Sequence, residues 1–82
     1  MSQKPDTKPG DYYVSAIDGK RYALLLGPFR DDHKAALAMV DKAQARAMQV
    51  DIKAPWYSYG TCRLEHGTGK PGVFNAYFGV KP

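Results

Sequence analysis

Residues 11–27, DYYVSAIDGKRYALLLG, hold two mainly apolar runs separated by a short polar stretch, and this pattern predicts two β-strands joined as a hairpin. The Asp18-Gly19 pair indicates the turn, because glycine adopts a positive φ without a steric penalty. A two-residue turn there pairs Ile17 with Lys20, whereas a four-residue loop shifts this register and leaves every side chain on the same face. Both faces of the hairpin are partly apolar, so the pattern does not predict which of them is buried.

The apolar spacing changes to a helical period after Phe29, and Asp31 or Asp32 is typical of a residue that caps the first turn of a helix. The helical period continues to about Val50, and Pro55 prevents its continuation. The predicted inner stripe comprises Ala36, Leu37, Met39, Val40, Ala43, Ala47 and Val50. Because most of these side chains are small, we expect the helix to lie close to a sheet that supplies the larger residues.

Residues 56–64 and residues 73–80 predict a third and a fourth strand, and the glycine-rich residues 65–72 predict a mobile hairpin loop between them. We expect the more apolar face of this second hairpin to meet the helix. That face comprises Trp56, Ser58, Gly60, Cys62 and Leu64 in the third strand, and Phe74, Ala76, Phe78 and Val80 in the fourth.

These elements predict an α+β fold in the order ββαββ, with one amphipathic helix packed on an antiparallel four-stranded sheet. Residues 11–82 form a single domain in this prediction. Residues 1–10, MSQKPDTKPG, have no large apolar side chain after Met1, which predicts a disordered tail. Because so small a domain has a small core, self-association would add buried surface.

The charge of the chain is mildly positive, with 12 Lys and Arg against 8 Asp and Glu and a net charge of +4. The basic residues are scattered, so this charge is compatible with nucleic acid without requiring it. Cys62 is the single cysteine, which excludes an intrachain disulfide. We find neither a secretory signal pattern nor an apolar run of membrane-spanning length, and we therefore expect a cytoplasmic location without membrane contact.

No group of residues in the chain predicts catalysis, a metal site, a small-molecule substrate or a cofactor. Residues 67–70, GTGK, are similar to part of a phosphate-binding loop, but Leu64 stands where that motif needs its first glycine. Cys62, His66 and His33 are too few for a four-ligand zinc site. A nucleophilic dyad of Cys62 and His33 stays open, because such partners need to be neighbours only in space. We expect a protein that is not an enzyme.

The sheet face opposite the predicted helix is the best candidate for binding, because it carries tyrosines next to polar and basic residues. The predicted binding residues are Tyr57, Tyr59, Arg63, Asn75 and Tyr77, with further contacts from His66 and Lys70 in the loop. Our main hypothesis is an accessory binding module that uses this face for a protein partner or a second copy of the chain. The alternative is single-stranded nucleic acid, since aromatic rings with basic neighbours stack on bases. Tyrosine also simply suits a half-exposed strand.

Residues 22–44, YALLLGPFRDDHKAALAMVDKAQ, resemble one half of a SPOR domain, in which a strand ending in Gly-Pro-Phe or Gly-Ser-Phe leads into a capped helix. The matching residues are Gly27, Pro28, Phe29, Ala35, Ala36 and Leu37. This resemblance implies binding to denuded peptidoglycan glycans in the bacterial periplasm. Across the whole chain, the segments YYVSAIDGKR, LLLGPF, YGTC and GVFNAYFG resemble small uncharacterised proteins of phages, prophages and plasmids. That second resemblance implies a cytoplasmic accessory protein that acts by binding.

Overall fold

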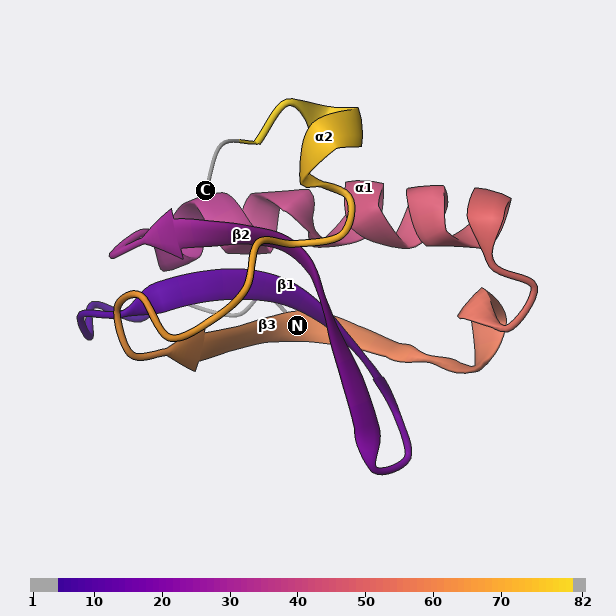
Figure 1. Cartoon of the computed structure of the whole chain (residues 1–82), viewed down its shortest axis with the longest axis horizontal. Helices are drawn as coiled ribbons and strands as arrows, with labels where there is room; N and C mark the ends of the chain where they lie inside the picture. Colours follow the sequence, from indigo (N-terminus) through magenta and orange to yellow (C-terminus); the bar gives the residue numbers. More distant parts are fainter. Residues whose placement is uncertain (1–4, 81–82) are drawn as a thin grey trace.

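The computed structural model describes residues 5–80 and contains a three-stranded antiparallel sheet with one long helix across a face (Figure 1). In chain order the elements are β1 (Asp11–Asp18), β2 (Arg21–Arg30), α1 (His33–Val50), a 3-10 helix η1 (Ala54–Trp56), β3 (Ser58–Leu64) and α2 (Asn75–Phe78). The strands lie in the order β2-β1-β3. The fold is α+β as predicted, but the four-stranded sheet of the ββαββ prediction is wrong, because residues 73–80 form no strand.

β1 and β2 form the predicted hairpin, but their register is shifted from the one expected for a two-residue turn at Asp18-Gly19. Asp18 pairs with Arg21 and Ile17 pairs with Tyr22, so the turn consists of the two residues between them. The first of these, Gly19, has a φ of 60°, which is a conformation that glycine adopts without strain. The prediction that Ile17 pairs with Lys20 is therefore wrong by one position in each strand, and the assignment of side chains to faces is unaffected at this end.

A β-bulge interrupts the hairpin near its open end. Ser15 pairs with Leu24, whereas the preceding residue, Val14, pairs with Leu26. Leu25 is therefore an extra residue in β2, and such an insertion bends the strand and changes which residues face one side. Both Leu25 and Leu26 are buried as a result. The simple alternation expected from the sequence would have placed one of them on each face.

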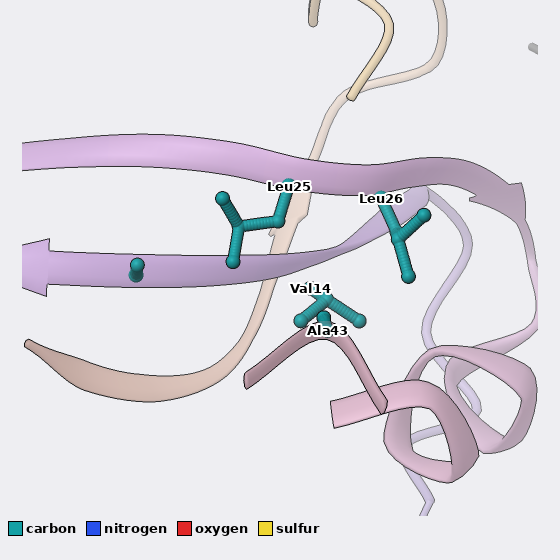
Figure 2. Close-up of a cluster of buried hydrophobic side chains, with 5 residues drawn as sticks. Val14, Leu25, Leu26 and Ala43 are labelled. Atoms are coloured by element: carbon teal, nitrogen blue, oxygen red, sulfur yellow. The ribbon is translucent and has the colours of Figure 1, made fainter. Parts of the chain in front are cut away.

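The core lies between the bulged part of the hairpin and α1. Figure 2 shows Leu25 and Leu26 of β2 above the side chains of Val14 and Ala43. These four residues and Ala16 form the buried cluster. Partly buried side chains complete it, namely those of Phe29, Met39, Val40, Tyr57, Tyr59, Phe74, Phe78 and Val80.

α1 begins and ends as predicted. The Asp32 side chain caps it by accepting a hydrogen bond from the Ala35 N–H at 3.1 Å, and the helix ends at Val50. Three alanines of the predicted inner stripe, Ala36, Ala43 and Ala47, are buried against the sheet. The stripe of small side chains thus allows the close approach that the sequence predicts, although Val50 at its end is exposed.

β3 occupies the predicted stretch, but the opposite face is turned toward α1. Tyr59 pairs with Ala16 and Thr61 pairs with Val14, and directly paired residues project to the same side of a sheet. Tyr59 and Thr61 therefore lie on the helix side, and Trp56, which belongs to η1, is 78% exposed. The prediction that Ser58, Gly60, Cys62 and Leu64 face the helix is wrong.

Residues 72–74, at the start of the predicted fourth strand, follow the outer edge of β2 and do not form a hairpin with β3. The N–H groups of Gly72, Val73 and Phe74 donate to the carbonyl oxygens of Gly27, Leu24 and Leu25 at 3.1, 3.0 and 2.8 Å. The chain then turns into α2 next to α1 (Figure 1). Two features end this pairing along β2 at Phe74. Asn75 makes a buried contact with Gly27, and Phe74 and Phe78 both reach the core from positions one helical turn apart.

The loop between β3 and residue 72 covers part of the sheet face opposite α1. Gly69 lies directly over Tyr13, and a Cβ added to this glycine would be 2.5 Å from the Tyr13 hydroxyl. Tyr13 and Ser15 are buried on this side. The sequence predicted a mobile loop here, whereas the structure packs Gly69 onto the sheet.

Residues 5–10 lie against the first residues of β1 and α1. The Asp6 N–H donates to His33 Nδ1 at 2.7 Å, and the Tyr12 hydroxyl donates to the Lys8 carbonyl at 2.7 Å. The disordered tail over residues 1–10 stays a prediction. Residues 1–4 of that tail and residues 81–82 of the predicted domain lie outside the described residues.

Candidate functional site

Two tyrosines of the predicted binding face, Tyr57 and Tyr59, turn toward α1 and pack against the core. The Tyr57 hydroxyl donates to Asp51 Oδ2 and the Tyr59 hydroxyl donates to the Ala54 carbonyl, both at 2.9 Å. The hydrogen bond to the Asp51 carboxylate, together with burial, raises the pKa of Tyr57, and burial raises the pKa of Tyr59. Because the connector after α1 satisfies both hydroxyls, the rings are free to face the core. For this reason, the apolarity of the side chains alone predicts the wrong face of β3 to be buried.

The other three predicted binding residues lie in separate places. Arg63 is exposed on the helix side of β3 and donates to a backbone carbonyl of the N-terminal segment at 3.1 Å. Asn75 is only 6% exposed, and its amide binds the N–H and the C=O of Gly27. Tyr77 lies on α2, with the Arg46 guanidinium 3.9 Å from its ring centroid. The structure therefore does not bring the five residues together on one face.

The two predicted loop contacts also differ from each other. His66 Nε2 lies 2.7 Å from Asp31 Oδ1, and the same oxygen accepts a hydrogen bond from the Gly10 N–H at 2.9 Å. The bond from Gly10 and then the bond with His66 hold the pKa of Asp31 below its usual value. Lys70 is exposed. His66 thus joins the loop to the start of α1, which is a structural use of this side chain.

His33 and Cys62 lie on opposite sides of the sheet. His33 stacks on Tyr12 with ring centroids 4.7 Å apart, and its Nε2 is 2.8 Å from Thr61 Oγ1 on the helix side. Since Nδ1 accepts the Asp6 N–H, the neutral ring carries its proton on Nε2 and donates it to Thr61. Cys62 is the next residue along β3 and points to the other face, where burial raises the pKa of its thiol. The structure therefore does not assemble the Cys62/His33 dyad.

A cleft of about 510 Å³ lies between the tip of the β1–β2 hairpin and the C-terminal end of α1. The hairpin tip extends away from α1 (Figure 1), and small side chains line both sides of the resulting space, Ala16 and Ala23 from the hairpin and Ala47 from the helix. The remaining lining residues are Asp18, Arg21, Tyr22, Leu25, Val50, Asp51, Lys53, Tyr57, Val73 and Phe74.

The charged residues of this cleft balance each other. Two carboxylates, Asp18 and Asp51, are matched by Arg21 and Lys53. Asp51 is fixed in place, because its Oδ1 accepts the Lys53 N–H at 2.9 Å and its Oδ2 accepts the Tyr57 hydroxyl. The cleft thus offers an apolar interior with charges of both signs, which does not favour a polyanion.

Exposed apolar side chains concentrate around the cleft. Eight large apolar side chains are exposed in residues 5–80, and Tyr22, Val50 and Val73 among them line the cleft. Two more are next to lining residues in the chain: Ile52 between Asp51 and Lys53, and Trp56 before Tyr57. Such a concentration on a small protein is typical of an interaction surface.

The amino-acid sequence alone does not predict this cleft, because the positions of its walls depend on tertiary contacts. One signal was present in the hairpin, where small residues occur at Ala16 and Ala23 and pair with each other. A second was Ala47 in the helix stripe. Only the bend of the hairpin relative to α1 brings the three together.

No protein-family model, no curated protein and no solved structure matches the chain. The resemblances to half of a SPOR domain and to small phage and plasmid proteins therefore stay predictions. Within residues 5–80, no helix is both long and apolar enough to cross a membrane. The same residues contain no group of three or more His, Cys, Asp or Glu side chains arranged to hold a metal ion.

Proposed function

We propose that this protein is a non-enzymatic accessory binding module that holds an extended, apolar segment of a protein partner in the cleft between the hairpin tip and the end of α1. The observation that carries the proposal is the concentration of exposed apolar side chains around that cleft, with Tyr22, Val50 and Val73 on its walls. Burial of these side chains by a partner is favourable in free energy. We also infer a cytoplasmic location from the single cysteine of the chain.

The backbone of β2 supports an extended conformation for the bound segment. The Leu24 carbonyl points away from β1, because it accepts the Val73 N–H. N–H and C=O groups alternate in direction along an antiparallel strand, so those of Tyr22 point outward too, at the cleft. A partner segment placed there gains main-chain hydrogen bonds from β2 and puts alternate side chains into the cleft.

Selection of peptides on the immobilised full-length chain tests this proposal. We expect enriched peptides with apolar side chains at alternate positions and with few charges. Ala23→Glu places a carboxylate in the cleft and should weaken their binding by about tenfold or more. Ala38→Glu makes the same change at an exposed position of α1 outside the cleft and should leave binding unchanged.

Equal binding to the wild type and to Ala23→Glu would contradict the proposal. Single-stranded nucleic acid is the other outcome to be measured. A labelled single strand that binds at low salt, with affinity that falls steeply as salt rises, would replace the protein partner with a polyanion. Co-sedimentation with denuded peptidoglycan would favour the glycan binding implied by the SPOR resemblance.

A further inference from the structure

β3 is an edge strand without the usual protection. Within residues 5–80 it pairs with β1 alone, and the pairing from Ser58 to Leu64 runs without a register shift. Its sequence, SYGTCRL, contains neither proline nor lysine, and Arg63 is its single charged residue. Edge strands of natural monomers usually carry a bulge, a proline or several charges that prevent pairing with another chain.

The opposite edge of the sheet is protected. There, the N–H groups of residues 72–74 bind the carbonyl oxygens of β2 along the inner part of the strand. Because both edges belong to the same sheet, the missing protection is specific to β3 and is not a property of the whole fold. Among the described residues, β3 is therefore the edge that is open along its whole length, whereas β2 is open only beside the cleft.

We propose that two copies of this chain pair through β3 in antiparallel orientation, about a two-fold axis at Thr61. Thr61 is the midpoint of Ser58–Leu64, so this is the register in which all seven residues of both strands are paired. The result is a continuous six-stranded sheet, β2-β1-β3-β3-β1-β2, with both α1 helices on the same face. A two-fold interface of this kind is self-complementary.

In this register the β3 side chains of one copy are complementary to those of the other. Tyr59 stands opposite Arg63 of the second copy on the helix side, where a half-buried aromatic ring meets an exposed guanidinium. Gly60 stands opposite Cys62 on the other side, where a small residue faces a larger one. The two Thr61 side chains meet at the axis, each held by His33 Nε2 of its own chain. A register centred on Arg63 would instead place two arginines opposite each other.

The dimer and the proposed peptide cleft are independent. No residue of β3 lines the cleft, so pairing of two β3 strands leaves both clefts open. Failure of one proposal therefore leaves the other intact. The occupant of the edge is a second copy and not an unrelated strand, because in the self-paired register Tyr59 of each copy meets Arg63 of the other.

Sedimentation velocity over a range from low micromolar to submillimolar concentration tests the dimer. We expect the mass to rise toward twice 9.1 kDa with concentration. Gly60→Lys adds a charge at a position where an added Cβ meets no other atom within 4 Å in the single chain, so it should fold normally and stay a monomer. Ala38→Lys on the exposed side of α1 is the matched control and should dimerise as the wild type does.

A cross-linking experiment tests the register and does not depend on the folding of the lysine variant. In a Cys62→Ser background, Thr61→Cys places the two thiols face to face at the axis, and mild oxidation should give a disulfide-linked dimer. Ser58→Cys in the same background faces Leu64 of the second copy and should stay largely unlinked. A monomer at all concentrations, a dimer that persists in Gly60→Lys, or efficient linkage of Ser58→Cys alone would overturn the proposal.

Discussion

At the residue scale, Tyr12 and Tyr13 are neighbours in β1 that project to opposite faces of the sheet and meet different environments. The Tyr12 hydroxyl donates to the Lys8 carbonyl, whereas the Tyr13 hydroxyl is the buried side-chain group of residues 5–80 that lacks a hydrogen-bond partner. Leaving a buried polar group unpaired costs about 1–3 kcal/mol. The gap between β1 and Gly69 is too tight to give this hydroxyl a protein partner.

Replacement of this hydroxyl by hydrogen should therefore stabilise the protein. We expect Tyr13→Phe to raise the free energy of unfolding by about 1 kcal/mol in urea titrations at neutral pH. Tyr12→Phe is the matched control, and it should lower the free energy of unfolding because it removes a formed hydrogen bond. A loss of stability in Tyr13→Phe would show that the hydroxyl has a partner after all, such as a bound water.

Alkaline pH should destabilise the fold through four tyrosines. Burial raises the pKa values of Tyr12, Tyr13 and Tyr59, and the bond to Asp51 raises that of Tyr57. Above a pH of about 10 the unfolded chain loses these protons first, so it binds fewer protons than the folded chain and stability falls as pH rises. The stabilisation is complete below that pH.

Urea titrations at neutral pH and near pH 10.5 in a Cys62→Ser background, which removes the thiol, measure this loss. Tyr57→Phe should make the loss smaller. Constant stability across this range would contradict the assignment of buried, protonated tyrosines.

Asn75, a predicted binding residue, has a structural use in the interior. Its amide pairs with both backbone groups of Gly27. Asn75→Ala leaves the Gly27 N–H without this acceptor and leaves the Gly27 carbonyl with the Gly72 N–H as its donor, and we expect a loss of about 2 kcal/mol or more in the free energy of unfolding. Asn75→Asp keeps the acceptor for the Gly27 N–H but puts a buried carboxylate oxygen against the Gly27 carbonyl, so it should cost at least as much. A change within about 0.5 kcal/mol for Asn75→Ala would instead fit an exposed binding residue.

At the element scale, α1 depends on small side chains to approach the sheet. Ala43 is fully buried beneath Val14 and the two leucines of the bulge. Ala43→Leu adds volume to this packed contact and should lower the free energy of unfolding by about 1–3 kcal/mol. Ala45→Leu makes the same change on the exposed side of the helix and should have little effect. Equal effects in thermal or urea unfolding would show that the stripe does not set the distance between helix and sheet.

The first hairpin and α1 were predictable because their signals are local. Gly19 permits the turn, Asp32 caps the helix by accepting the N–H of Ala35 three residues later, and the alanines recur at helical spacing. Residues 73–80 were not predictable in the same way. The apolar positions in this segment fit a helical turn as well as a strand. The contact of Asn75 with Gly27, which is 48 residues away in the chain, favours the helical turn.

At the scale of the whole molecule, the candidate site depends on how elements are placed relative to one another. The face of β3 was assigned by apolarity, but Tyr57 and Tyr59 face the core because Asp51 and Ala54 bind their hydroxyls. The surface that we propose for binding is consequently a cleft at one end of the molecule and not a flat tyrosine face. Sequence patterns describe faces of single elements, and a cleft between the hairpin tip and α1 is a property of their packing.

Amide shifts measured by NMR during titration of the isotope-labelled full chain with a selected peptide show whether the peptide binds in the cleft. We expect the largest changes at Ala16, Tyr22, Ala23, Ala47 and Val73, on both walls of the cleft. Ala23→Glu should abolish these changes, and Ala38→Glu should preserve them. Changes centred on β3 and Arg63, or changes that persist in Ala23→Glu, would contradict the account of the cleft as the binding site.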